Sequence, residues 1–397
     1  MGGSAQGGAI GVVGAGAMGS GIAQVAALHG HAVILADAEP QAIARARNGH
    51  DRALTREVEK GRLTRDEAGA AGSRIRYVEG ADAASLQALA PCEIVIEAVV
   101  EDLGVKQALF RSLEAIVQPD TVLASNTSSL SIAAIASACE RTARVIGIHF
   151  FNPAPVMPLV EIVPAITTDP HLTSAVRATV DRWGKTTVIA ADTPGFIVNR
   201  IARPFYGEAL RIHEEGIADF ATIDWAMREL GGFRMGPFEL MDFIGLDVNF
   251  AVSSSVFAAM FYDPRYRPAL LQQRLVEAGL LGRKSGRGFY DYRDGAAKPE
   301  PTTDETVGGA IVDRILAMLV NEAAEAVHLR VATPQDIELA MTKGVNYPRG
   351  LLAWGDAIGA DEILARLIAL HEEYGEDRYR PSAHLRRVAR GGGRLLA

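Results

Sequence analysis

Short apolar runs, separated by amphipathic segments of helix length, fill the first half of the chain. The runs occupy residues 9–13, 32–36, 75–78, 94–97, 122–124 and 143–149. Continuously apolar runs in this alternation are typical of parallel strands that helices cover on both faces. Two further strands are expected at 159–163 and 187–190, with a helix over 171–183 between them. The pattern therefore predicts an α/β domain with a doubly wound, mostly parallel sheet.

Long helical patterns replace this alternation after residue 191, where a Pro-Gly pair favours a turn. Comparison of the chain with itself at a shift of 114 residues aligns 197–247 with 311–361 without a gap. The recurring positions include Arg200, Glu208, Asp242 and Gly245, which match Arg314, Glu322, Asp356 and Gly359. A stretch rich in Pro, Thr and charge, 295–306, is the expected linker. We therefore predict an α/β domain over 1–191 and two copies of an all-α domain over 192–298 and 306–397.

The composition is that of an ordinary folded chain, with 48% hydrophobic and 22% charged residues, which excludes a disordered or fibrous protein. A formal charge of −8 argues against nucleic-acid binding. No apolar run approaches a membrane span, and residues 1–8 lack the features of a signal peptide, so we expect a cytoplasmic protein with no membrane partner. Cys92 and Cys139 show no zinc-like spacing, and His29 and His31 are expected to be structural. We expect reduced cysteines and no metal.

Three glycines follow the first apolar run in the order that a dinucleotide-binding turn requires, within Gly14-Ala-Gly-Ala-Met18-Gly19. Gly14 permits the tight turn, Gly16 lets a pyrophosphate approach the backbone, and Gly19 allows close packing of helix on strand. Asp37 ends the second run, where its carboxylate would bind ribose hydroxyls and repel a 2′-phosphate. The motif predicts a Rossmann-type domain that binds NAD in preference to NADP.

Polar residues at the ends of later strands suggest the chemistry. Ligands of open α/β sheets bind beyond the carboxyl ends of the strands, where Ser128 and His149 are expected. A neutral histidine is suited to take the proton from an alcohol that loses hydride. Glu161 would orient the imidazole, and Ser128 and Asn199 would bond the reacting oxygen.

Each of these residues also has a structural interpretation. His149 in an apolar strand would be a satisfied core residue, and Asp37 would cap the next helix. Ser129 or Ser131 is expected to be a helix cap. Glu161 is harder to explain structurally, because an unpaired buried carboxylate costs several kcal/mol.

Motifs spread over residues 10–292 resemble the 3-hydroxyacyl-CoA dehydrogenases. They are 14–19 (GAGAMG), 125–130 (SNTSSL), 149–153 (HFFNP), 192–200 (DTPGFIVNR), 236–240 (GPFEL) and 284–290 (KSGRGFY). The resemblance implies NAD-dependent interconversion of an L-3-hydroxyacyl-CoA and a 3-oxoacyl-CoA, in fatty-acid or aromatic-acid catabolism. The alternatives are an enzyme for 3-hydroxybutyryl-CoA or for a dicarboxylic 3-hydroxyacyl-CoA, a related sugar-acid dehydrogenase, and a non-catalytic NAD-binding protein.

The resemblance also implies roles for single residues. It makes His149 the catalytic base, Glu161 its acidic partner, and Ser128 and Asn199 the residues near the substrate oxygen. The implied cofactor contacts are Gly14, Gly16, Met18, Gly19, Asp37, Glu101, Lys106, Ser128, Asn152 and Lys284. Lys60 matches a lysine that contacts CoA, but a serine used beside it in some relatives is Ala53 here. Arginines 45, 47, 52 and 56 either meet CoA phosphates or form a solvated basic face.

The second copy of the all-α domain is not expected to hold an active site. Asn199 aligns with Asp313 there, and no dinucleotide motif precedes it. The resemblance suggests that this copy replaces the contacts that a partner subunit makes in shorter relatives. The chain would then be a self-sufficient monomer, or a homodimer formed through another surface.

Overall fold

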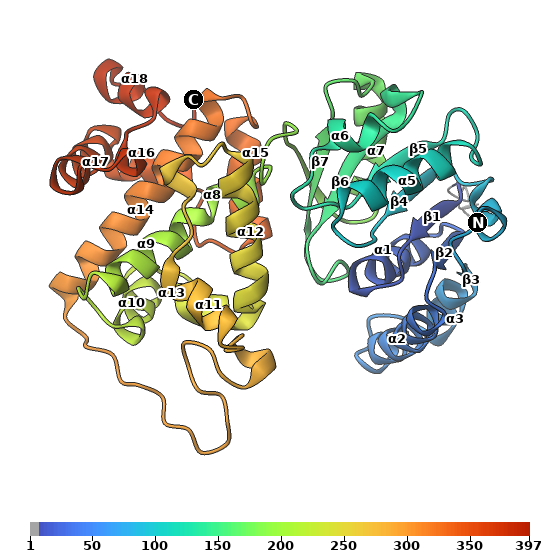
Figure 1. Cartoon of the computed structure of the whole chain (residues 1–397), viewed down its shortest axis with the longest axis horizontal. Helices are drawn as coiled ribbons and strands as arrows, with labels where there is room; N and C mark the ends of the chain where they lie inside the picture. The colour runs from blue at the N-terminus through green and yellow to red at the C-terminus, as the bar shows by residue number, and fades with distance from the viewer. Residues whose placement is uncertain (1–7) are drawn as a thin grey trace. The chain divides into compact units, whose positions relative to one another are not determined.

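The computed structural model describes residues 8–397, and these divide after Asp192 into two compact units, 8–192 and 193–397 (Figure 1). One sheet of eight strands, in the order β3-β2-β1-β4-β5-β6-β7-β8, forms the centre of the first unit. The strands are β1 (Ile10–Val13), β2 (Val33–Asp37), β3 (Ile75–Glu79), β4 (Ile94–Glu97), β5 (Val122–Ser125), β6 (Val145–Phe150), β7 (Leu159–Pro164) and β8 (Thr186–Ile189). All neighbours are parallel except β6 and β7, which are antiparallel. The predicted doubly wound, mostly parallel sheet is confirmed.

Helices connect the strands of this unit. They are α1 (Ala17–Leu28), α2 (Pro40–Glu59), α3 (Arg65–Ser73), α4 (Ala83–Leu86), α5 (Leu103–Glu114), α6 (Ile132–Ala136) and α7 (Pro170–Arg182). Short polar side chains define several helix starts, because each accepts a bond from an otherwise unpaired backbone N–H. Ser131 caps α6 in this way, as one of the two serine alternatives predicted. His31 accepts a hydrogen bond from the buried Trp183 indole at 2.9 Å, which agrees with a structural role.

The second unit is predominantly helical, with two isolated β-bridges that both involve Arg287. Its first part contains α8 (Val198–Ile201), α9 (Arg203–Glu214), α10 (Phe220–Trp225), α11 (Pro237–Ile244), α12 (Leu246–Ala259) and α13 (Leu270–Glu277). Its second part contains α14 (Glu305–His328), α15 (Pro334–Leu339), α16 (Leu351–Ile358), α17 (Ala360–Tyr374) and α18 (Ala383–Gly391). α14 takes the place of α8 and α9 together. Helices α10, α11 and α12 correspond to α15, α16 and α17 at the shift of 114 residues, and α13 corresponds to α18 at a shift of 113. Gly245 and Gly359 adopt matching left-handed φ angles of 103° and 109° between equivalent helices.

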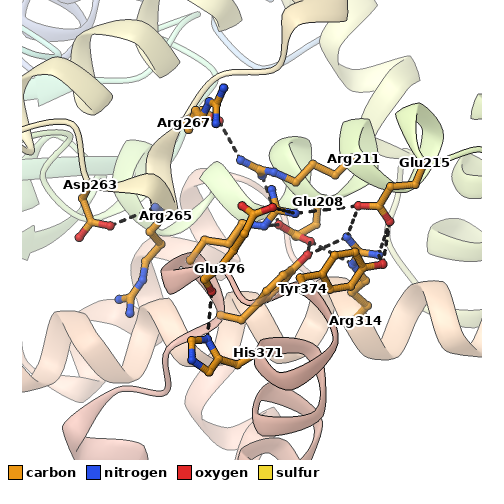
Figure 2. Close-up of polar contacts among 12 residues, drawn as sticks. Glu208, Arg211, Glu215, Asp263, Arg265, Arg267, Arg314, His371, Tyr374 and Glu376 are labelled. Atoms are coloured by element: carbon orange, nitrogen blue, oxygen red, sulfur yellow. Dashed lines mark hydrogen bonds and ion pairs between the residues drawn. The ribbon is translucent and has the colours of Figure 1, made fainter.

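Buried ion pairs join the two copies crosswise. Arg200 in the first copy bonds Glu322 in the second at 2.7 Å, and Arg314, the equivalent of Arg200, bonds Glu208, the equivalent of Glu322, at 3.0 Å. Figure 2 shows the second of these clusters, in which Glu215 and Tyr374 also bond Arg314. Each copy therefore supplies the counter-charge that the other needs, and α14 packs on α9 along this contact.

Three further features concern the cysteines, membrane-spanning helices and metal-binding groups. Cys92 and Cys139 are free and buried, and burial raises the pKa of the Cys92 thiol to about 12 and, as the main cause, that of Cys139 to about 11. Between residues 8 and 397 no single helix is long and apolar enough to cross a membrane, although α11 and α12 pass that test as a pair bent by 101°. The same residues contain no group of three or more His, Cys, Asp or Glu side chains that could hold a metal ion.

The buried crosswise ion pairs predict that removing one of their charges lowers the stability of the protein more than removing an exposed charge does. Glu322→Gln leaves the guanidinium groups of Arg200 and Arg265 buried beside a neutral amide. We expect this change to lower the free energy of unfolding by about 3–5 kcal/mol, measured by urea denaturation. Glu277→Gln, which removes the partner of the exposed Arg274, is the matched control and should change stability little. Equal losses in the two variants would contradict a structural role for the buried pairs.

Candidate active site

The turn between β1 and α1 has the geometry that a pyrophosphate needs. Gly14 has a φ of 104°, and a Cβ there would lie 2.4 Å from the Ala98 carbonyl oxygen. A Cβ on Gly19 would lie 1.8 Å from the Gly14 carbonyl oxygen, so helix and turn touch there. A Cβ on Gly16 would meet nothing within 4 Å. The turn is thus closed on its protein side and open at Gly16, where backbone N–H groups at the start of α1 can face an anion.

Asp37 stands at the carboxyl end of β2 and points back toward this turn. Its Oδ2 accepts a hydrogen bond from the Ala15 amide at 2.6 Å, and its Oδ1 accepts one from the Glu39 amide at 2.8 Å. Glu39 is the residue that precedes α2 as its N-cap, so the alternative that Asp37 caps this helix is wrong. The carboxylate therefore faces the glycine turn.

A largely apolar pocket of about 590 Å³ adjoins the turn and Asp37. Its walls come from the ends of β1, β2 and β4 and from α2, α4 and α5, and include Gly14, Gly16, Asp37, Ala42, Leu86, Val100, Val105 and Leu109. Its volume and its lining suit a flat heterocycle, which apolar side chains bind through its faces. An open glycine turn, a carboxylate and an apolar slot together fit the phosphates, ribose and adenine of NAD.

His149 and Glu161 form a buried pair on the two antiparallel strands. The register of β6 and β7 places them directly opposite each other, and His149 Nδ1 lies 2.6 Å from Glu161 Oε2. Glu161 is fully buried and His149 is 5% exposed. Because the carboxylate accepts the proton of Nδ1, the neutral ring carries its lone pair on Nε2. This arrangement fixes the orientation of the His149 imidazole at the carboxyl end of β6.

Glu101 organises the loop that follows β5. Its Oε1 accepts hydrogen bonds from Thr127 Oγ1 at 2.6 Å and from the backbone amides of Ser128 and Ser129 at 3.1 and 3.2 Å. Burial opposes ionisation of Glu101, but the bonds from Thr127 and Ser129 and the charge of Lys106 outweigh it and lower the pKa of this carboxyl. The loop that carries Ser128 is therefore held by an ionised glutamate.

Lys106 lies inside the protein, where it joins two carboxylates. Its ammonium is 1% exposed and lies 2.6 Å from Glu97 and 3.2 Å from Glu101. Ser125 also donates to Glu97 at 2.6 Å. Glu97 was not among the residues that the sequence suggested, although its place as the last residue of an apolar run was a usable signal. The ion pair with Glu97 thus holds the Lys106 ammonium in place beside Glu101.

A second unpredicted residue connects neighbouring strand ends. Asn126 Oδ1 accepts a hydrogen bond from the Phe150 amide at 2.9 Å, so it ties the loop after β5 to the end of β6, one residue beyond His149. Asp192 bonds Ser131 and the first amides of α6, which anchors the last residue of the first unit to the same loop region.

The remaining predicted residues lie on other elements. Met18 stands in the first turn of α1 and packs partly on the core, and Asn152 is exposed just after β6. Lys60 follows α2 on the surface, 3.9 Å from Glu57. Asn199 on α8 and Lys284, which bonds Asp247 at 2.6 Å, belong to the second unit.

The sequence matches two family models in succession. Residues 9–193 match the 3-hydroxyacyl-CoA dehydrogenase NAD binding domain, and residues 195–292 and 309–394 each fall in matches to the C-terminal domain of the same family. The chain belongs to the 3-hydroxyacyl-CoA dehydrogenase family. The predicted resemblance, the cofactor NAD and the reaction class, NAD-dependent oxidation of a 3-hydroxyacyl-CoA, are confirmed.

Individual relatives agree with this assignment. The chain is 39% identical over 465 residues to the 3-hydroxyadipyl-CoA dehydrogenase of Escherichia coli (strain K12), covering 96% of this chain and 97% of the relative. It is 43% identical to a 3-hydroxybutyryl-CoA dehydrogenase of Bradyrhizobium diazoefficiens, over 74% of this chain and 97% of that protein. A solved structure described as 3-hydroxybutyryl-CoA dehydrogenase from Escherichia coli K12 superposes with a TM-score of 0.89 at 38% identity, covering 96% of this chain and 98% of that one.

The two glycine environments predict different effects of the same substitution. Gly16→Ala places its methyl group in open space, so we expect an unchanged melting temperature but weaker NADH binding, because the methyl obstructs the pyrophosphate. Gly19→Ala forces a methyl into the Gly14 carbonyl and should lower the melting temperature itself. Fluorescence titration with NADH and thermal unfolding measure the two effects. Unaltered NADH affinity in folded Gly16→Ala would show that the phosphates bind elsewhere.

Proposed function

We propose that His149 is the general base that removes the hydroxyl proton of an L-3-hydroxyacyl-CoA while hydride leaves C3. The observation that carries this proposal is the 2.6 Å contact between His149 Nδ1 and Glu161 Oε2 at the end of β6. A carboxylate in this position fixes the tautomer and stabilises the imidazolium that forms when Nε2 accepts a proton. NAD, when bound, supplies the hydride acceptor.

Ser128 and Asn199 bond the reacting oxygen in this proposal. Ser128 is held by Glu101, which is in turn paired with the buried Lys106. The pyrophosphate and adenosine ribose of NAD meet Gly14, Gly16 and Asp37, with Met18, Gly19, Glu101, Lys106, Asn152 and Lys284 as further contacts or supports. The position of Lys106 between two carboxylates favours a supporting role over direct contact with the nucleotide. Lys60, exposed at the end of α2, is proposed to meet CoA.

The acyl group is proposed to be short or to end in a second carboxylate. Both alternatives have support, since the relatives are named for 3-hydroxyadipyl-CoA and for 3-hydroxybutyryl-CoA. We further propose that the enzyme works in the cytoplasm.

The second helical copy is proposed to replace a partner subunit. The crosswise pairs of Arg200 with Glu322 and of Arg314 with Glu208 bury charges that an isolated first copy would leave uncompensated. The domains proposed for this organisation are 1–191, 192–298 and 306–397, with a single active site. The chain is then self-sufficient as a monomer.

His149→Ala should lower turnover by about 10²–10⁴-fold, because the base is lost, while NADH still binds. Glu161→Gln should lower turnover less, since the ring remains but its imidazolium is less stable. The assay follows NADH absorbance with 3-hydroxybutyryl-CoA and with 3-hydroxyadipyl-CoA. Full turnover in a folded His149→Ala variant would refute the assignment of the base.

A self-sufficient chain predicts activity that does not depend on protein concentration. Sedimentation velocity of the full chain should show one species near the 42.3 kDa mass of the chain, and specific activity should stay constant on dilution. A dimer that loses activity as it dissociates would contradict the replacement of a partner by the second copy.

A further inference from the structure

One buried arginine in the second unit is unlike the others. Six arginines are less than 9% exposed: Arg144, Arg200, Arg203, Arg265, Arg314 and Arg378. Five of them lie within 4.0 Å of a carboxylate, as their ion pairs with Glu114, Glu322, Glu208 and Glu376 show. Arg203 has no such partner anywhere in residues 8–397. A buried cation without a counter-charge is costly, so its presence calls for a reason.

The neighbours of Arg203 are polar but neutral. Its Nε donates to the Asn199 backbone oxygen at 2.7 Å and its Nη1 donates to Ser253 Oγ at 2.9 Å. Its guanidinium carbon lies 5.1 Å from the centre of the Tyr206 ring. Burial lowers the pKa of Arg203, opposed by the interactions with Tyr206 and Tyr347. Within the described chain Nη2 donates no hydrogen bond, and the buried hydroxyl of Tyr347 has no partner either.

The internal repeat shows that the fold does not require these polar groups. At the shift of 114 residues, Arg203, Tyr206 and Ser253 correspond to Ala317, Val320 and Leu367, and Tyr347 corresponds to Phe233. All four equivalents are buried apolar residues in the same unit. The module therefore packs with apolar side chains at each of these positions. The polar side chains at these positions occur together at one place, beside Asn199.

The spacing from Asn199 defines what would fit. Arg203 follows Asn199 by four residues, and its bond to the Asn199 carbonyl holds the guanidinium within one helical turn, about 5.4 Å, of that residue. In an extended acyl chain, a carboxylate at C6 places its oxygens about 5 Å from C3. A six-carbon dicarboxylic acyl group with C3 at Asn199 would thus bring its second carboxylate to Arg203.

We propose that Arg203, assisted by Tyr347, binds the second carboxylate of a six-carbon dicarboxylic L-3-hydroxyacyl-CoA and so determines substrate specificity. This proposal rests on the proposed function, in which Asn199 lies near the reacting oxygen. The guanidinium would pair with the carboxylate through charge-assisted bonds, which are strong away from water. A substrate without the carboxylate leaves the buried cation unpaired, and a site of this kind discriminates strongly against such a substrate.

The test compares two acyl-CoA substrates of equal carbon number, 3-hydroxyadipyl-CoA and 3-hydroxyhexanoyl-CoA, which differ in the terminal carboxylate. The full chain should show a higher kcat/KM for the adipyl substrate. Arg203→Gln, which keeps a donor for the Asn199 carbonyl but removes the charge, should lower the ratio of the two kcat/KM values by about 100-fold. Arg203→Lys should retain part of the ratio, and Tyr347→Phe should lower it by about 10-fold through the lost hydroxyl.

Arg211→Gln is the matched control, because Arg211 lies on the same helix α9 and pairs with Glu208 at 3.2 Å. The ratio should not change in this variant. If the wild-type chain oxidises neither of these substrates and 3-hydroxybutyryl-CoA is not oxidised either, the proposed function fails; if it oxidises 3-hydroxybutyryl-CoA alone, this inference alone is overturned. If it oxidises 3-hydroxyhexanoyl-CoA but shows no preference, or if Arg203→Gln slows both substrates equally, this inference alone is overturned. Should Arg203→Gln not fold, Arg203→Lys and Tyr347→Phe decide the outcome through the same ratio.

Discussion

A charge that folding removes from water needs an opposite charge or several hydrogen bonds facing it, because an isolated buried ion costs several kcal/mol. In the first unit this requirement brings Glu161 against His149 and Glu97 against Lys106. In the second unit it joins the two helical copies, since among residues 8–397 the carboxylate that pairs with Arg200 is that of Glu322, in the other copy. The interactions that compensate the core charges are thus also those that orient the proposed base and assemble the helical unit.

The sheet topology makes the first of these pairs possible. A parallel neighbour of β6 would run in the same direction as the strand that carries His149, whereas the antiparallel β7 returns beside it and brings Glu161 into register. Asn126 then ties the preceding loop to the same strand end through the Phe150 amide. A single reversal in an otherwise parallel sheet therefore places His149, Glu161 and the loop after β5 at one edge.

Comparison of the two helical copies distinguishes the residues that packing requires from those proposed to act on the substrate. Residues common to both copies, such as Arg200 and Arg314, form equivalent buried pairs. Residues that differ mark the part proposed to face the substrate, where Asn199 has Asp313 as its equivalent and Arg203 has Ala317. Two copies of one fold in one chain thus provide an internal comparison, in which divergence at a buried position is informative because the other copy shows the apolar alternative.

The sequence by itself determined the α/β sheet, the glycine turn and the repeat, because strand periodicity, turn chemistry and internal similarity are local properties of the chain. It also suggested His149 and Glu161, as polar residues inside apolar runs. Only the tertiary structure decided that Asp37 faces the turn instead of capping α2, that Lys106 is enclosed by carboxylates, and that the copies exchange counter-charges. The tertiary structure likewise decided that Arg203 is buried with no carboxylate partner in residues 8–397. These outcomes depend on which side chains far apart in sequence become neighbours, and periodicity carries no information about that.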